Sequence, residues 1–408
     1  MATNRMLSAT SDERRAHGVL QRKAGDADRV RRATGHRERR NVRHRTLLLA
    51  RQRCQIQGTR RTDRISVSSR LPTARWRRAA RIHFTARHVP PDSDTLRVGI
   101  AQIAPVWLDR DATIDKVCTW IEGAARDACE LVAFGEALVP GYPFWLERTD
   151  GARFESPLQK ALHAHYLDQA VDLERGDLHR VQEAAADHGI HVCVGTIERP
   201  ADRGGHSVYC TLVQVNGEGR IVVAHRKLMP TYEERLAWAT GDGHGLRTTR
   251  VGAFTVGALN CWENWMPLPR AALYAQGEDL HVATWPGNVR NTQDITRFIA
   301  REGRSYVLSA CALMRREDIG DALPFAEVLQ DASDDVMANG GSCIAAPDGQ
   351  WLVEPVADAE CLIAATLHHG LVRRERQTFD PVGHYSRPDV TRLVVDRRRQ
   401  GTAEFTDA

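Results

Sequence analysis

From residue 96 onward, apolar and polar residues alternate in stretches typical of strands and helices. Apolar runs at 96–103, 131–134 and 254–260 predict buried strands. Over 111–129, apolar residues recur every three or four positions, which predicts a helix with one apolar stripe. Further strands are expected at 190–196, 208–215 and 220–224, and further helices at 157–171, 177–188 and 267–276; the segments 280–284, 294–303, 306–312, 342–346, 351–354 and 361–367 continue the mixture.

The order of these elements predicts a layered α/β domain. Asn216-Gly217 between two apolar runs predicts a hairpin, whose second strand ends just before Lys227. Hairpins mixed with strand-helix alternation favour sheets whose faces are covered by helices. The charged stretch 314–340 is expected to be an exposed insertion or loop, and the polar end after about Val395 is expected to fray.

Charge divides the chain into two unlike parts. Residues 1–93 contain 23 arginines and one lysine against seven acidic residues, a net charge of +17, whereas the remaining residues carry −13. The first part shows little apolar periodicity, so we expect a disordered or spuriously included extension. A basic arm can also bind nucleic acid or an anionic membrane surface, or resemble a transit peptide. The domain is expected at 94–375, followed by a C-terminal segment at 376–408.

Two absences narrow the cellular setting. No stretch approaches the 18 or so apolar residues of a membrane span, and no secretory signal is evident. We therefore expect an intracellular, cytoplasmic protein with no membrane partner. The nine cysteines are an odd number and contain no Cys-x-x-Cys pair, which predicts reduced thiols rather than a disulfide frame or a zinc site.

One cysteine stands where chemistry is expected. The strand predicted at 254–260 stops at Cys261, and prolines at 267 and 269 begin a helix soon after. A sulfur on such an elbow lies beside free backbone N–H groups, which favour a thiolate and any neighbouring oxyanion. The rest of the chain must then supply a base and a cation.

Four stretches carry a resemblance to a known family. Residues 261–264 (CWEN), followed by 266–268 (MPL) and Arg270, resemble the nucleophile motif of nitrilases, the nitrile-hydrolysing branch of the carbon-nitrogen hydrolase superfamily. Upstream, in the expected order, lie counterparts of the catalytic glutamate and lysine motifs. They are 134–137 (FGEA) leading into 140–143 (PGYP), and 225–231 (HRKLMPT) with 234–235 (ER). Residues 380–389 resemble the closing segment of nitrilases, so the resemblance runs from about 96 to about 395.

The resemblance implies a fold, an assembly and a mechanism. The fold is the nitrilase-like α-β-β-α four-layer sandwich, and the assembly is a homodimer or a larger spiral homo-oligomer. Glu136 is the implied proton shuttle, Cys261 the nucleophile, and Lys227 with the backbone N–H of Trp262 the stabiliser of developing charge. Glu234 is implied to contact the lysine and help position substrate. No metal or organic cofactor is needed.

Some functional assignments stay open at this point. Tyr142 and Trp285 are candidate aromatic walls of a substrate pocket, although large aromatics also simply fill core volume. An amidase or a cyanide-hydrolysing member of the same superfamily is the main alternative, and CWEN favours nitrile chemistry. A nucleic-acid-binding or scaffold protein that uses the basic arm is a second alternative, with nucleic acid the less expected partner. The sequence does not determine whether the preferred nitrile is aliphatic, aromatic or an arylacetonitrile.

Overall fold

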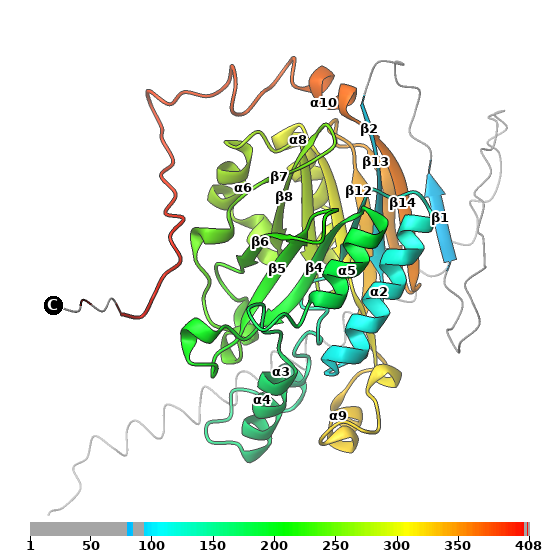
Figure 1. Ribbon diagram of the computed structural model, residues 1–408, viewed down its shortest axis with the longest axis vertical. Coiled ribbons are helices and arrows are strands. Elements are labelled where there is room, and N and C mark those ends of the chain that lie inside the picture. The colour runs from blue at the N-terminus through cyan, green and yellow to red at the C-terminus, as the bar shows by residue number, and fades with distance from the viewer. Residues whose placement is uncertain (1–79, 85–93, 404–405, 407–408) are drawn as a thin grey trace, which may run out of the picture. The chain divides into compact units, whose positions relative to one another are not determined.

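Two seven-stranded β-sheets face each other and form the centre of the structure (Figure 1). The computed structural model describes residues 80–84, 94–403 and 406, and all of them belong to one contact unit, Arg64–Ala408. Most of the predicted extension at 1–93 therefore lies outside the described residues. Among the described residues, no helix combines the length and apolar character needed to cross a membrane.

The first sheet brings two candidate site residues to one edge. Its strands, in spatial order, are β1 (Ala80–Phe84), β14 (Cys361–His368), β2 (Thr95–Gln102), β3 (Leu131–Phe134), β4 (His191–Glu198), β5 (Tyr209–Val215) and β6 (Ile221–Arg226). β3 and β4 pair in parallel, and two antiparallel pairings then connect β4 to β6 through β5. β3 and β6 consequently run in the same direction, so Glu136 and Lys227 both follow strands that end at the same edge.

The second sheet presents the cysteine. Its strands are β11 (Leu313–Arg315), β12 (Val336–Ala345), β10 (Tyr306–Cys311), β9 (Leu280–Trp285), β8 (Phe254–Asn260) and β7 (Thr249–Val251), with β13 (Trp351–Ala357) paired to β12. β8, β9 and β10 are parallel neighbours, and all three are buried along their full length. Cys261 follows β8 directly, as the apolar run in the sequence predicted.

Apolar side chains hold four layers together. Alternate residues of β2, such as Val98 and Ile100, pack into a core shared with Val256 and Leu308 of the second sheet. The intervening Ala101 faces the opposite side, in a cluster with residues of α2 (Arg110–Arg126) and α5 (His179–His188). The period of two within each strand thus fills one core between the sheets and one beneath the helices.

Helices cover the outer face of the second sheet as well. Ile295 and Ile299 of α8 (Ile295–Gly303) pack against β9 and β10, and Leu273 of α6 (Pro267–Tyr274) packs against Leu259 of β8. This confirms the expected four-layer α/β arrangement. The remaining helices are α3 (Trp145–Arg148), α4 (Pro157–Gln169), α7 (Val289–Thr292), α9 (Ala326–Ala332) and α10 (His369–Glu375). Short 3₁₀ turns are η1 (Ala201–Arg203), η2 (Tyr232–Leu236), η3 (Gly243–Gly245), η4 (Cys261–Trp265) and η5 (Arg316–Asp318).

The structure corrects the expectation of a loop at 314–340, although much of this stretch is exposed as expected. This stretch contains most of β11, all of η5 and α9, and the beginning of β12, which pairs antiparallel with β11. Met314, Leu329 and Ala338 are buried together in a core cluster with residues of the first half of the chain. Charged residues are scattered through this segment and obscure the few apolar residues that anchor it in the core.

Both ends of the described chain also differ from expectation. Within the predicted extension, Ala80–Phe84 forms β1, whose backbone pairs in parallel with β14; apolar residues alternate in its sequence ARIHF, a strand pattern. The end after Val395 is not wholly frayed. Arg399 donates to the buried carboxylate of Asp242 at 3.0 Å, as does the backbone N–H of Gln400 at 3.1 Å, because a buried carboxylate requires such partners.

Candidate active site

The backbone turns sharply at Cys261, where β8 gives way to η4. Cys261 has a φ of +47°, a left-handed conformation that a residue with a Cβ adopts only when its surroundings enforce it. Asn260 and Glu263 cap the turn reciprocally, and the Asn260 N–H donates to the Glu263 carboxylate at 3.0 Å. Glu263 also accepts the Leu228 N–H at 2.9 Å and contacts the His225 ring at 2.9 Å. This carboxylate therefore ties the cysteine elbow to the segment that carries Lys227.

A second set of buried contacts connects the elbow to β9. The Asn264 amide donates to the Cys261 carbonyl at 2.9 Å, and its oxygen contacts Nε2 of His281 at 2.7 Å. The other ring nitrogen of His281 lies 2.8 Å from Glu278. All three side chains are fully buried. Arg270, paired with Glu302, donates to the Asn264 carbonyl at 2.7 Å and so joins α6 to the elbow.

Glu136 lies immediately beyond β3 and is fully buried. Its backbone N–H donates to the carbonyl of Trp285 at 3.1 Å, which connects the ends of β3 and β9 across the two sheets. The close fit requires glycine on the neighbouring strand, since a Cβ at Gly195 would lie 2.4 Å from the Gly135 carbonyl oxygen. Backbone packing thus fixes where the carboxylate sits.

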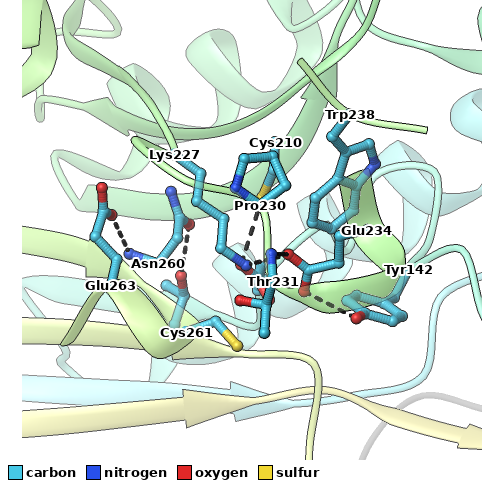
Figure 2. Close-up of polar contacts among 12 residues, drawn as sticks. Tyr142, Cys210, Lys227, Pro230, Thr231, Glu234, Trp238, Asn260, Cys261 and Glu263 are labelled. Atoms are coloured by element: carbon cyan, nitrogen blue, oxygen red, sulfur yellow. Dashed lines mark hydrogen bonds and ion pairs between the residues drawn. The ribbon is translucent and has the colours of Figure 1, made fainter. Parts of the chain in front are cut away.

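Lys227 occupies the centre of the site (Figure 2). Its ammonium lies 2.9 Å from Oε1 of Glu136 and 2.6 Å from Oε2 of Glu234, and all three side chains are buried. Its backbone N–H donates to the Cys210 carbonyl at 2.8 Å, and its ammonium lies 5.3 Å from the centre of the Trp238 ring. One cation is therefore held between two carboxylates and against an aromatic face.

The structure distinguishes Glu234 from the adjacent Glu233. Glu234 caps η2 by accepting the Thr231 N–H at 2.6 Å, and it accepts the Tyr142 hydroxyl at 2.8 Å. Glu233 is only half-buried and does not pair with Lys227. The expected contact between Glu234 and the lysine is therefore present.

The sulfur of Cys261 joins this cluster. One donor atom each from Glu136, Glu234 and Cys261 lies within 4.8 Å of the others, the one group in the described part of the chain with metal-ligand spacing. The ammonium of Lys227, however, already contacts both carboxylates, so it fills the cation position of the cluster. The three predicted catalytic side chains thus converge, as does Glu234.

Burial and neighbouring charges set the protonation of the cluster. Burial raises the pKa of Glu136 to about 7, although the Lys227 charge opposes the shift. Burial alone would lower the pKa of Lys227, but the negative charges of the Glu136 and Glu234 carboxylates raise it well above its ordinary value. The lysine is therefore an ammonium, and Glu136 titrates near neutrality.

The cysteine differs from the sequence expectation of a favoured thiolate. Burial and the negative charge of Glu136 raise the pKa of the Cys261 thiol well above its ordinary value. Lys227 and a hydrogen bond from the Trp262 backbone N–H act in the opposite direction without prevailing. The resting sulfur is thus a thiol, which makes a nearby base necessary for nucleophilic attack.

A cavity of about 760 Å³ lies beside the elbow. Tyr142 and Trp262 line it together with Glu234 and Cys261. Trp285 is not among the lining residues. Its indole is fully buried and donates to Ser309 at 3.4 Å, and the following Pro286 and Gly287 form the wall instead. The complete lining is Tyr142, Pro143, Phe144, Glu147, Arg148, Thr231, Glu233, Glu234, Cys261, Trp262, Pro286, Gly287, Asn288, Arg290, Asn291, Val336 and Met337.

Sequence reasoning missed several residues that hold the site together. Cys210 lies within the strand predicted at 208–215, and its sulfur contacts Glu136. His225 begins the HRKLMPT motif and was given no role, although it bonds Glu263. Trp238 carried no pattern at all. Of these three residues, only His225 could have been identified from the sequence, because it lies in the same motif as Lys227.

Comparison with known proteins places the chain in a family. The carbon-nitrogen hydrolase family model matches residues 97–377. A protein named nitrilase 2 from an unidentified prokaryote is 36% identical, covering 76% of this chain and 95% of that protein. An aliphatic nitrilase of Sinorhizobium fredii (strain HH103) is also 36% identical, covering 74% of this chain and 95% of its own length. The chain belongs to the carbon-nitrogen hydrolase family.

Solved structures show the same fold. A carbon-nitrogen hydrolase from Helicobacter pylori G27 superposes with a TM-score of 0.56 at 16% identity, covering 72% of this chain and 96% of that one. The family resemblance and the nitrilase-like α/β sandwich expected from the sequence are therefore confirmed.

Proposed function

We propose that this protein is a nitrilase, which hydrolyses an organic nitrile to the carboxylic acid and ammonia. The observation that carries the proposal is the buried cluster in which the Lys227 ammonium lies 2.9 Å from Glu136, beside the thiol of Cys261 on its strained elbow. The relatives named nitrilases support nitriles as the substrate class. Glu136, Lys227 and Cys261 are the proposed catalytic residues.

The first half of the reaction forms a covalent thioimidate. Oε2 of Glu136 is buried and has no hydrogen-bond partner among the described residues, so it is free to accept the thiol proton. The sulfur then attacks the nitrile carbon, one C–N π bond breaks, and the proton passes to nitrogen. Lys227 and the Trp262 N–H stabilise the charge that develops on that nitrogen.

The second half consumes two waters. Glu136, again a carboxylate, removes a proton from the first water as it adds to the thioimidate carbon, and the amine leaves as ammonia to give a thioester. A second water cleaves the C–S bond, releases the carboxylic acid and restores the thiol. Glu234 holds the lysine and accepts from Tyr142, so we assign both to positioning around the cavity.

Two finer expectations belong with this proposal. A homodimer or larger spiral is expected from the family resemblance, and light scattering on the purified chain would measure it. A cytoplasmic location likewise stays a prediction. The pocket residue Tyr142 remains a proposed substrate contact because it lines the cavity.

A panel of aliphatic, aromatic and arylacetonitriles, each paired with its amide, tests the function by ammonia release. We expect turnover of at least one nitrile, with free acid as the main product. Activity confined to amides would instead identify an amidase, and activity confined to cyanide a cyanide hydrolase. A matched control is Cys118→Ala, which removes a half-buried thiol of α2 outside the cluster and should leave turnover unchanged.

A further inference from the structure

Cys210 lies beside Lys227 at the centre of the site (Figure 2). It lies on β5 with 1% of its surface exposed. Its carbonyl accepts the backbone N–H of Lys227 at 2.8 Å, and its sulfur lies 3.5 Å from Oε1 of Glu136.

The direction of this hydrogen bond follows from the chemistry of the two groups. Burial and the negative charge of Glu136 raise the pKa of the Cys210 thiol well above its ordinary value, so the sulfur keeps its proton. An ionised carboxylate can only accept. The thiol therefore donates to Oε1, which also contacts the Lys227 ammonium, while Oε2 is left without a partner among the described residues.

We propose that Cys210 is a positioning residue for Glu136, whose S–H holds Oε1 so that Oε2 is the oxygen left to exchange protons with the reacting sulfur and water. The proposal rests on the base role assigned to Glu136 under the proposed function. A thiol is a weak donor, so it orients the carboxylate while removing little of its basicity. A hydroxyl in the same place would donate more strongly and make the carboxylate a weaker base.

Other ionisable groups act on Glu136 from the surrounding elements and stay constant when Cys210 changes. They are Lys227 beyond β6, Glu234 in η2, Cys261 in η4, Tyr142 in the loop before α3 and Tyr166 in α4. A substitution at Cys210 therefore isolates one hydrogen bond. Removing it should raise the pKa of Glu136, and strengthening it should lower that pKa.

The test compares Cys210→Ala and Cys210→Ser in the full chain. The rate at which iodoacetamide alkylates Cys261 is measured from pH 5 to 9 by peptide mass spectrometry, alongside circular dichroism to verify folding. Because Glu136 must be ionised to accept the thiol proton, the rate should fall below pH 7 in the wild type. We call this acid-side fall of the rate the acid limb. We expect its midpoint to move up by about half to one pH unit in Cys210→Ala and down in Cys210→Ser.

Cys193→Ala is the matched control. Cys193 is a buried thiol on the adjacent strand β4, in the core between the sheets, and its side chain makes no hydrogen bond or ion pair with any described residue. Its loss should leave the limb in place. Shifts of the two Cys210 variants in the same direction, or no shift in either, would overturn the positioning role.

This readout also separates the inference from the nitrilase assignment. Alkylation of Cys261 needs no nitrile turnover, so opposite shifts in a protein that hydrolyses no nitrile would uphold Cys210 as a positioning residue and reject the proposed substrate. If the protein hydrolyses nitriles but its acid limb does not shift in the Cys210 variants, the positioning role is rejected and the nitrilase assignment is kept.

Discussion

At the scale of single residues, the site depends on a resting thiol and a carboxylate poised near neutrality. The burial that holds Cys261 protonated also raises the pKa of Glu136, and the ammonium of Lys227 opposes both effects. A neutral thiol beside an ionised carboxylate can transfer its proton only during attack. Catalysis therefore depends on the pH range in which Glu136 is a carboxylate.

This gives a signed pH prediction. The pKa of Glu136 is about 7, so the carboxylate is mostly protonated below that pH and cannot act as a base. The kcat/KM for a nitrile should fall about tenfold per pH unit below pH 7, with a plateau above it. Measurement with an uncharged nitrile excludes substrate ionisation. A limb near pH 4.5, the ordinary value for glutamate, would contradict the predicted environment.

Lys227→Ala should affect both activity and stability. It leaves Glu136 and Glu234 buried without their shared cation, so we expect about 3–5 kcal/mol of destabilisation and a loss of turnover of about a hundredfold or more. Denaturant unfolding and ammonia release measure the two effects.

Lys116→Ala is the control for this variant, because it removes another buried lysine, which pairs with Glu360 just before β14. It should lower stability without lowering the turnover of the folded fraction. Equal effects of the two variants on turnover would refute a special role for Lys227.

At the scale of elements, the cysteine elbow is held by buried polar chains from two directions. Glu263 joins η4 to His225 at the end of β6, and Asn264 joins it to His281 of β9. Satisfied polar networks of this kind rigidify a segment because each unpaired member would be costly to bury. They account for the persistence of a positive φ at Cys261.

Gly257→Ala tests this support at a distance from the sulfur. A Cβ at Gly257 of β8 would lie 2.0 Å from Glu278 Oε1, so Glu278 must move away from His281 and the contact to Asn264 loosens. We expect about 1–3 kcal/mol of destabilisation and slower alkylation of Cys261 by iodoacetamide. Gly320→Ala, where the added methyl meets nothing within 4 Å, should change neither quantity. An unchanged alkylation rate in Gly257→Ala would show that the elbow does not depend on the contacts among Glu278, His281 and Asn264.

Periodicity predicted elements wherever burial is continuous. The runs at 131–134 and 254–260 became β3 and β8 with the same bounds, because strands buried on both faces are apolar throughout. Periodicity predicted no element at 314–340, where a few buried apolar residues such as Leu329 anchor a stretch rich in charged residues. Motifs located Glu136, Lys227 and Cys261, but they carried no information on Cys210 or on the burial of Trp285, which depend on tertiary packing.

At the scale of the whole molecule, the domain is built so that the ends of strands from both sheets meet. β3 and β6 of the first sheet and β8 of the second deliver the three proposed catalytic side chains. Since the family model matches residues 97–377, we predict that the chemistry requires little of the Arg-rich part of the chain.

Truncation tests this prediction. A chain that begins at Ala80 keeps β1 and should retain nitrile turnover within about twofold, whereas one that begins at Leu96 also loses the strand paired with β14 and should be less stable. Any binding of nucleic acid by the full chain should weaken steeply with salt and vanish in both truncations. Loss of turnover in the chain beginning at Ala80 would give residues 1–79 a role in the enzyme.

The most direct test of the account is the covalent intermediate itself. The protein is mixed with a nitrile that it turns over and quenched in acid within milliseconds to seconds. The masses of its peptides are then measured by mass spectrometry. The account predicts an acyl or imidoyl adduct on the peptide that contains Cys261, and neither adduct nor ammonia release in Cys261→Ala. Undiminished ammonia release from Cys261→Ala would contradict it.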